Sequence, residues 1–223
     1  MSPEQLFGCL LSANFAVLMN DNFNQLASAL PEHRVRRLLA EHWGIETRAD
    51  CLRVIGQRVE QLGKISPAEM QAVAAWLEEQ RPGGEGVRPG LRSTVGLASG
   101  DEMSHGHLSV LAWDIQQLAY LVRLAHAVGH VSRSDAEAVL ERLAVRARMH
   151  FGSWKVYSLA ALVGLGMRGA MEVFETSAWE RYSRTHSILL RGRCSPIRFA
   201  SPWGAVAPRL PADASHPAFK APA

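Results

Sequence analysis

The stretch Ser109–Gly129, SVLAWDIQQLAYLVRLAHAVG, decides the fold. Its apolar residues recur at helical spacing, and Gly129 is typical of a residue that ends a helix. At 100° per residue, one side carries Leu111, Asp114, Leu118, Leu121, Ala125 and Val128. The opposite side, expected to be polar, carries Gln116, Ala119, Arg123, His126 and His130. Asp114 is therefore predicted to be buried, where a carboxylate must be paired, hydrogen-bonded or protonated.

Two interpretations of Asp114 follow from this position. The first is a buried hydrogen-bond anchor, because buried polar groups are usually satisfied and inert. The second is a catalytic acid or base. We expect Trp113 and Trp154 to pack beside one another near Asp114. If they instead line an open cleft with Arg123 or the histidines, a small-ligand pocket becomes the alternative.

Capping signals predict where the other helices begin. Ser2, Pro3 and Gln5 open a long apolar helix, which a polar break over residues 20–24 ends. A helical region is expected over residues 26–43, restarted by Pro31 and stopped by Gly44, and Thr47 begins a helix over 47–63. The Ser66–Glu69 spacing repeats the cap signature before a helix over 66–77. Further helices are expected over 132–151, where Ser132 and Asp135 form a capping box, and from residue 153 onward. The last is uncharged from 156 to 167 and is expected to be the central, most buried element. The fold class is all-α, a bundle of mostly antiparallel helices.

One segment divides the chain. Residues 81–90 contain two prolines and four glycines, which cannot sustain a regular element. We expect an N-terminal helical half over 1–80, a linker or mobile loop over 81–106 and a C-terminal helical core over 107–203. Residues 204–223 carry scattered prolines and are expected to form a flexible tail. Two subdomains and one bundle with a long connection are both consistent with this division.

Composition restricts the class of protein. The chain has 223 residues, 48% of them hydrophobic, and a formal net charge of only +3. It is long enough to be stabilised by its hydrophobic core without metal ions or disulfide bonds. Cys9, Cys51 and Cys194 are far apart in sequence, and no apolar stretch resembles a signal peptide or is long enough to span a bilayer. A cytoplasmic protein without a membrane partner is expected.

Several sites of known chemistry are not favoured by the sequence. His105, His107, His126 and His130 are the candidate metal ligands, but no carboxylate or thiolate at suitable spacing completes a set, so no metal is expected. Ser153 is explained by helix capping, and no nucleophile elbow, phosphate loop or dinucleotide motif is present, so no cofactor is expected. Residues 181–209 hold six arginines and no acid, but the modest net charge makes nucleic acid an unlikely partner.

The central motif resembles a known family. Ala112-Trp113-Asp114, Arg123, Gly129, Ala136 and Ser153-Trp154 are similar in identity and spacing to the core of a bacterial family, the domain of unknown function 1266. Outside this core, Trp43-Gly44-Ile45, Ser195-Pro196 and Ser201-Pro202-Trp203 are similar to its flanking motifs. His130 stands where the family usually has tyrosine, and Ile197 where it often has tryptophan. The resemblance covers about 23–203 and implies a helical bacterial domain without implying an activity.

These observations favour a regulatory or protein-interaction module, with an immunity-type protein as one form of it and another protein as its partner. The alternative is an enzyme or small-ligand binder with a cleft around Asp114. The candidate residues, functional or core-anchoring, are Trp113, Asp114, Arg123, Ser153 and Trp154. The catalytic residues, if any, and the oligomeric state stay open at this point.

Overall fold

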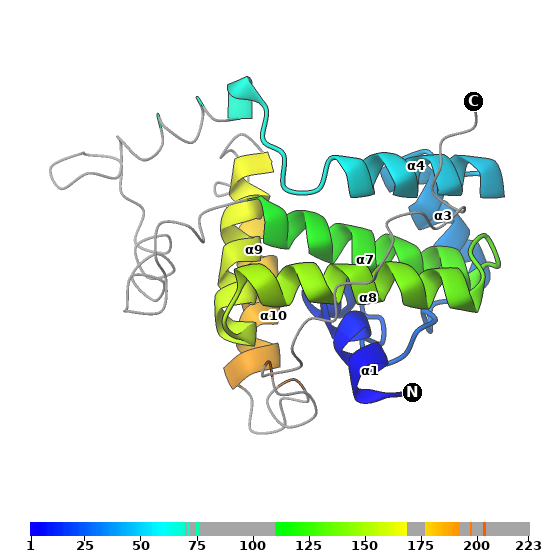
Figure 1. Cartoon of the computed structure of the whole chain (residues 1–223), viewed down its shortest axis with the longest axis horizontal. Helices are drawn as coiled ribbons and strands as arrows, with labels where there is room; N and C mark the ends of the chain where they lie inside the picture. Colours follow the sequence, from blue (N-terminus) through cyan, green and yellow to red (C-terminus); the bar gives the residue numbers. More distant parts are fainter. Residues whose placement is uncertain are drawn as a thin grey trace, which may run out of the picture.

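The computed structural model describes residues 1–69, 110–168 and 177–191, and the single residues 71, 75, 197 and 203. Within them the protein is helical and contains no strand, which confirms the all-α fold class. The helices are α1 (Pro3–Leu10), α2 (Ala13–Leu18), α3 (Glu32–Trp43), α4 (Arg48–Glu60), α7 (Leu111–Ala127), α8 (Arg133–His150), α9 (Trp154–Arg168) and α10 (Ser177–Arg191). In Figure 1, α7 and α8 lie side by side, and α9 and α10 run across one end of this pair.

Helix α7 is the centre of the fold. It packs against α1, α2, α3, α4, α8 and α9. The prediction of a polar side for α7 was wrong, because Gln116, Ala119 and Arg123 are all fully buried. Periodicity distinguishes two sides only when one faces water, and α7 is covered on both. The expectation that the helix after Ser153 is the central element was also wrong. That helix, α9, packs mainly against α7 and α10, whereas α7 packs against six elements.

The N-terminal segment differs from the single long helix that was predicted. The helix is interrupted at Leu11 and Ser12, which separate α1 from α2. The Ser12 hydroxyl donates to the Cys9 carbonyl at 2.9 Å and accepts a hydrogen bond from Arg123. The side chain thus takes part in contacts that an uninterrupted apolar helix would not need. The helix expected from residue 26 begins only at Glu32.

The capping predictions were correct wherever the signal is local. Ser2 and Thr47 form reciprocal capping boxes with Gln5 and Asp50. Ser132 accepts a hydrogen bond from the Asp135 amide at the start of α8, although the Asp135 carboxylate bonds the Ser132 hydroxyl instead of its backbone. Gly44 ends α3 with a left-handed φ of 62°. A few neighbouring residues suffice to determine such caps.

The two halves of the sequence share one hydrophobic core. Helix α4 packs on α7, α1 packs on α8, and α2 packs on α10. Of the two arrangements left open by the sequence, the contacts favour one bundle. The predicted segments 81–106 and 204–223 lie outside the described residues, so those boundaries stay predictions. No helix in the described ranges combines the length and apolar character needed to cross a bilayer.

Candidate functional site

The site is built on the turn that follows α4. Gly63 has a φ of +74°, a left-handed conformation that favours glycine. A β-carbon at this position would also approach Leu111 Cδ1 to 3.1 Å. This close approach places the Gly63 amide beside the first turn of α7, where it donates to Asp114 Oδ2 at 3.0 Å.

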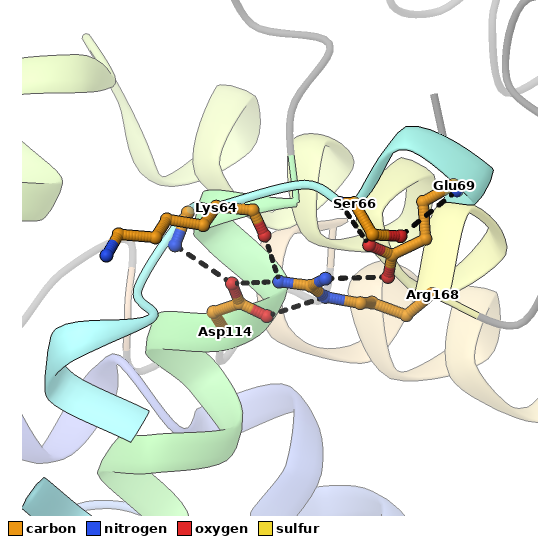
Figure 2. Close-up of polar contacts among 6 residues, drawn as sticks. Lys64, Ser66, Glu69, Asp114 and Arg168 are labelled. Carbon is orange, nitrogen blue, oxygen red and sulfur yellow. Dashed lines mark hydrogen bonds and ion pairs between the residues drawn. The ribbon is translucent and has the colours of Figure 1, made fainter. Parts of the chain in front are cut away.

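Asp114 is paired with the last residue of α9. Arg168 Nε donates to Asp114 Oδ1 at 3.1 Å, and Arg168 Nη2 donates to Oδ2 at 2.7 Å, which makes the pair bidentate. Figure 2 shows the guanidinium between the two acidic side chains of the network. An acid near the start of α7 and an arginine at the end of α9 are each favourable for the helix dipoles. The burial predicted for Asp114 is confirmed, with 9% of the residue exposed.

Glu69 holds the other edge of the guanidinium. Arg168 Nη1 donates to Glu69 Oε1 at 2.6 Å, and the Ser66 amide donates to Oε2 at 2.7 Å. Burial acts to raise the pKa of Glu69, but the hydrogen bonds from Ser66 and Arg168 outweigh it and lower the pKa. For Arg168, burial lowers the pKa, but its bonds to Asp114 and Glu69 raise it overall. Glu69 and Arg168 therefore stay ionised near neutral pH.

Above this network lies a cleft of about 410 Å³. It is lined by Arg58, Gln61, Lys64, Ile65, Ser66, Glu69, Asp114 and Arg168. The lining comes from the end of α4, the chain after it, the start of α7 and the end of α9. The Lys64 carbonyl accepts from Arg168 Nη2 at 2.9 Å, while the Lys64 side chain extends away from Arg168 (Figure 2). One arginine thus joins three separate parts of the chain at the floor of the cleft.

The hydrogen bonds of Asp114 determine the chemistry available to it. Both of its oxygens accept hydrogen bonds, from the Gly63 amide and from Arg168. Together these bonds use three of the about four lone-pair positions of the carboxylate and leave one on Oδ1, whereas a general base needs a free lone pair directed at the proton that it removes. The arrangement therefore favours the anchoring interpretation of Asp114 over the catalytic one.

The two candidate tryptophans lie in separate aromatic clusters. The Trp113 ring is 4.9 Å from that of Phe15 and 5.4 Å from that of Tyr182, centroid to centroid. The Trp154 ring contacts Phe7 at 4.7 Å and Trp203 at 4.8 Å. Trp154 begins α9 and Arg168 ends it, about 21 Å apart at 1.5 Å per residue. The expectation that both tryptophans pack beside one another near Asp114 was wrong.

Arg123 is fully buried and binds the chain between α2 and α3. Its Nε donates to the Gln25 carbonyl at 2.9 Å, its Nη1 to Ser12 Oγ at 2.9 Å, and its Nη2 to the Asn22 carbonyl and side-chain oxygen at 2.7 Å each. Burial lowers the pKa of the guanidinium, although an arginine still stays charged. Arg123 does not line the Asp114 cleft, and neither do Trp113 and Trp154, so the cleft differs from the alternative one in which the two tryptophans would lie beside Arg123.

Ser153 and the histidines have local roles. Ser153 Oγ accepts from the Val156 amide at 3.2 Å, as expected of a cap for α9. The His126 ring contacts the Val131 carbonyl through Nδ1 at 3.1 Å. Partial burial, together with nearby Arg36 and Arg48, lowers the pKa of His130. Within the described residues no three histidine, cysteine or acidic side chains form a metal-binding group, and His105 and His107 lie outside those residues.

Sequence reasoning missed most partners of Asp114. Arg168 is 54 positions away and Gly63 is 51, so no helical spacing relates them. A signal existed for Glu69, because the Ser66–Glu69 spacing predicted a capping box, which the structure contains. A further clue was Arg168 itself, since it is the first charged residue after the uncharged part of α9.

The fold and site together define an all-α bundle whose central helix carries a paired carboxylate at the floor of a polar cleft. The sequence matches the family described as Protein of unknown function (DUF1266) over residues 38–203, so this chain belongs to that family. The matched range contains the entire Asp114 network. Comparisons with curated proteins and with solved structures found no match.

Proposed function

We propose that this protein is a regulatory binding module that takes a small polar ligand in the Asp114 cleft and does not transform it. The observation that carries the proposal is the cleft itself, a hollow of about 410 Å³ lined by several polar side chains. Ligand pockets commonly measure about 300 to 1,000 Å³ and use a few convergent polar groups. The bonds that occupy both oxygens of Asp114 support binding over catalysis.

Regulation follows from what the ligand would touch. The cleft lining belongs to the end of α4, the following turn, α7 and α9. A ligand that bridges these parts stabilises their observed arrangement, by about 2.7 kcal/mol at a concentration 100 times its Kd. The effect would be transmitted through Arg168, which already holds the same parts together.

The protein-interaction role expected from the sequence has less support. The large apolar residues exposed among those described are Met1, which precedes α1, Met149 in α8 and Ile188 in α10. Single exposed apolar residues are common on protein surfaces and do not by themselves indicate a docking surface. The bacterial origin, the cytoplasmic location and the immunity-type role stay predictions.

The test is a binding screen by amide NMR on the full-length chain. Amino acids, nucleotides, sugars, polyamines and dicarboxylic acids are added separately at millimolar concentration. We expect at least one class to shift the Gly63 and Ser66 amides saturably and to be recovered unchanged. No saturable shift, or shifts confined to residues away from the cleft, would overturn the proposal. A compound consumed during the assay would favour the enzyme alternative.

A matched pair of variants checks the location. Gln61, which directly follows α4, lines the cleft, whereas Gln57, one turn earlier in α4, does not; both are exposed. Gln61→Trp should abolish binding by filling the cleft, and Gln57→Trp should leave it unchanged. Equal effects of the two substitutions would place the ligand elsewhere.

A further inference from the structure

The acidic and the basic side chains of the Asp114 cleft differ in how many of their hydrogen-bonding groups have partners. Three cationic side chains line it, Arg58, Lys64 and Arg168, and two acidic ones, Asp114 and Glu69. Both acids already accept hydrogen bonds from Arg168 and from backbone amides. The two acids therefore accept five hydrogen bonds between them, and their negative charge already has the Arg168 guanidinium and backbone amides beside it.

The donors of the cleft are less fully used. Arg168 makes four hydrogen bonds, through Nε, through Nη1 once and through Nη2 twice, which leaves one N–H of Nη1 without an acceptor among the described contacts. Arg58 and the Lys64 ammonium have no ion-pair or hydrogen-bond partner in the described part of the chain, and both residues are exposed. Arg58 also has no acid three or four residues away in sequence, whereas Arg36, Arg53 and Arg133 each pair with one at that spacing.

We propose that the ligand of this cleft is a small anion bearing carboxylate or phosphate groups, held by Arg58 and Lys64, an inference that rests on the proposed function. An anion supplies acceptors where the cleft has unused donors, and it balances the two unpaired cations. A concave surface with an excess of one charge also raises the local concentration of the opposite charge. A cationic ligand would be repelled by both cations and would meet acids that already accept hydrogen bonds.

The experiment compares four probes on the full-length, isotope-labelled protein at fixed ionic strength. Pyrophosphate and citrate represent the two anion chemistries, spermidine is the cationic probe and glucose the neutral one. We expect saturable shifts of the Gly63 and Ser66 amides with pyrophosphate, citrate or both, and not with spermidine or glucose. Comparing the two anions shows which group the cleft prefers.

Paired charge variants provide the second readout. Arg58→Gln with Lys64→Gln should weaken anion binding about tenfold, which corresponds to about 1.4 kcal/mol. The control, Arg36→Gln with Arg37→Gln, removes the same charge from the exposed side of α3 and should change the Kd less than about twofold at matched ionic strength. All four positions are exposed, so the fold should be retained, which the dispersion of the amide spectrum checks.

Each outcome has a defined meaning. Equal weakening by the two variants, or anion-induced shifts outside the cleft, would overturn the anion assignment. Binding of spermidine or glucose at the Gly63 and Ser66 amides, without anion binding, would also overturn it but would preserve the proposed function. If neither these probes nor the broader screen shifts those amides, both proposals fail.

Discussion

Replacing Arg123 tests whether a buried cation holds the chain between α2 and α3. Arg123→Met removes the donor of four hydrogen bonds and leaves the buried Ser12 hydroxyl and the part-buried Asn22 and Gln25 carbonyls without it. An unsatisfied buried acceptor costs about 1 to 3 kcal/mol. The substitution also removes the desolvation cost of the guanidinium, which offsets part of this loss. We therefore expect the free energy of unfolding to fall by about 3 kcal/mol, less than the largest combined cost of two unsatisfied acceptors.

For a domain of this size such a loss lowers Tm by about 6 to 12 °C. Urea and thermal unfolding followed by circular dichroism give both values, and chymotrypsin should cleave native protein after Phe23 or Leu26 faster than in the parent. Arg133→Met is the control, because Arg133 pairs with Glu137 on the exposed surface of α8 and should cost less than about 1 kcal/mol. An Arg123→Met protein as stable as the parent would refute the anchoring role.

Three further predictions concern other parts of the fold. Trp154→Ala should cost about 3 to 5 kcal/mol in urea unfolding, because the buried ring packs between Phe7 and Trp203; a loss below about 1 kcal/mol would contradict this packing. Ser153→Ala should lower stability by about 1 kcal/mol through loss of the α9 cap, whereas Ser153→Asp should retain it; equal stabilities would argue against capping. Cys9 and Cys51 are buried, and burial raises the pKa of Cys51 to about 11. Peptide mapping after brief iodoacetamide treatment at pH 8 should find both unmodified in native protein and alkylated in urea; native labelling at the unfolded rate would contradict their burial.

The features predicted correctly from the sequence depend on neighbours within one helical turn. Ser2 and Ser132 were identified as caps because the cap and its amide partner are three residues apart, and Thr47 was identified as the start of a helix. Gly44 was identified as a helix end because only its own backbone conformation matters. Family membership was likewise carried by local motifs with defined spacing, and the match over 38–203 confirmed it.

The features missed depend on how the helices pack. Gln116 and Arg123 are polar but buried, because Gln116 donates a hydrogen bond to the Asn14 side-chain oxygen and Arg123 donates to the Asn22 carbonyl. A pattern based on polarity places such residues on the surface. No glycine or proline marks the helix break at Ser12. The Ser12 side chain accepts a hydrogen bond from Arg123, which lies 111 residues later and could not be related to Ser12 by local spacing. The cleft could not be predicted because it needs three distant segments in one place.

A double-mutant cycle between Asp114 and Arg168 tests the central claim most directly, namely that Asp114 is an anchor at the floor of the cleft and not a catalytic group. Urea unfolding is measured for the parent, Asp114→Ala, Arg168→Ala and the double variant. The two nitrogen–oxygen contacts, at 2.7 and 3.1 Å, predict a coupling of about 2 kcal/mol, reduced from a fully buried pair because a quarter of the Arg168 side chain is exposed. Asp114→Ala alone should clearly lower Tm. A coupling near zero, or an Asp114→Ala protein that melts at or above the parent temperature, would contradict the anchoring role and favour the catalytic one.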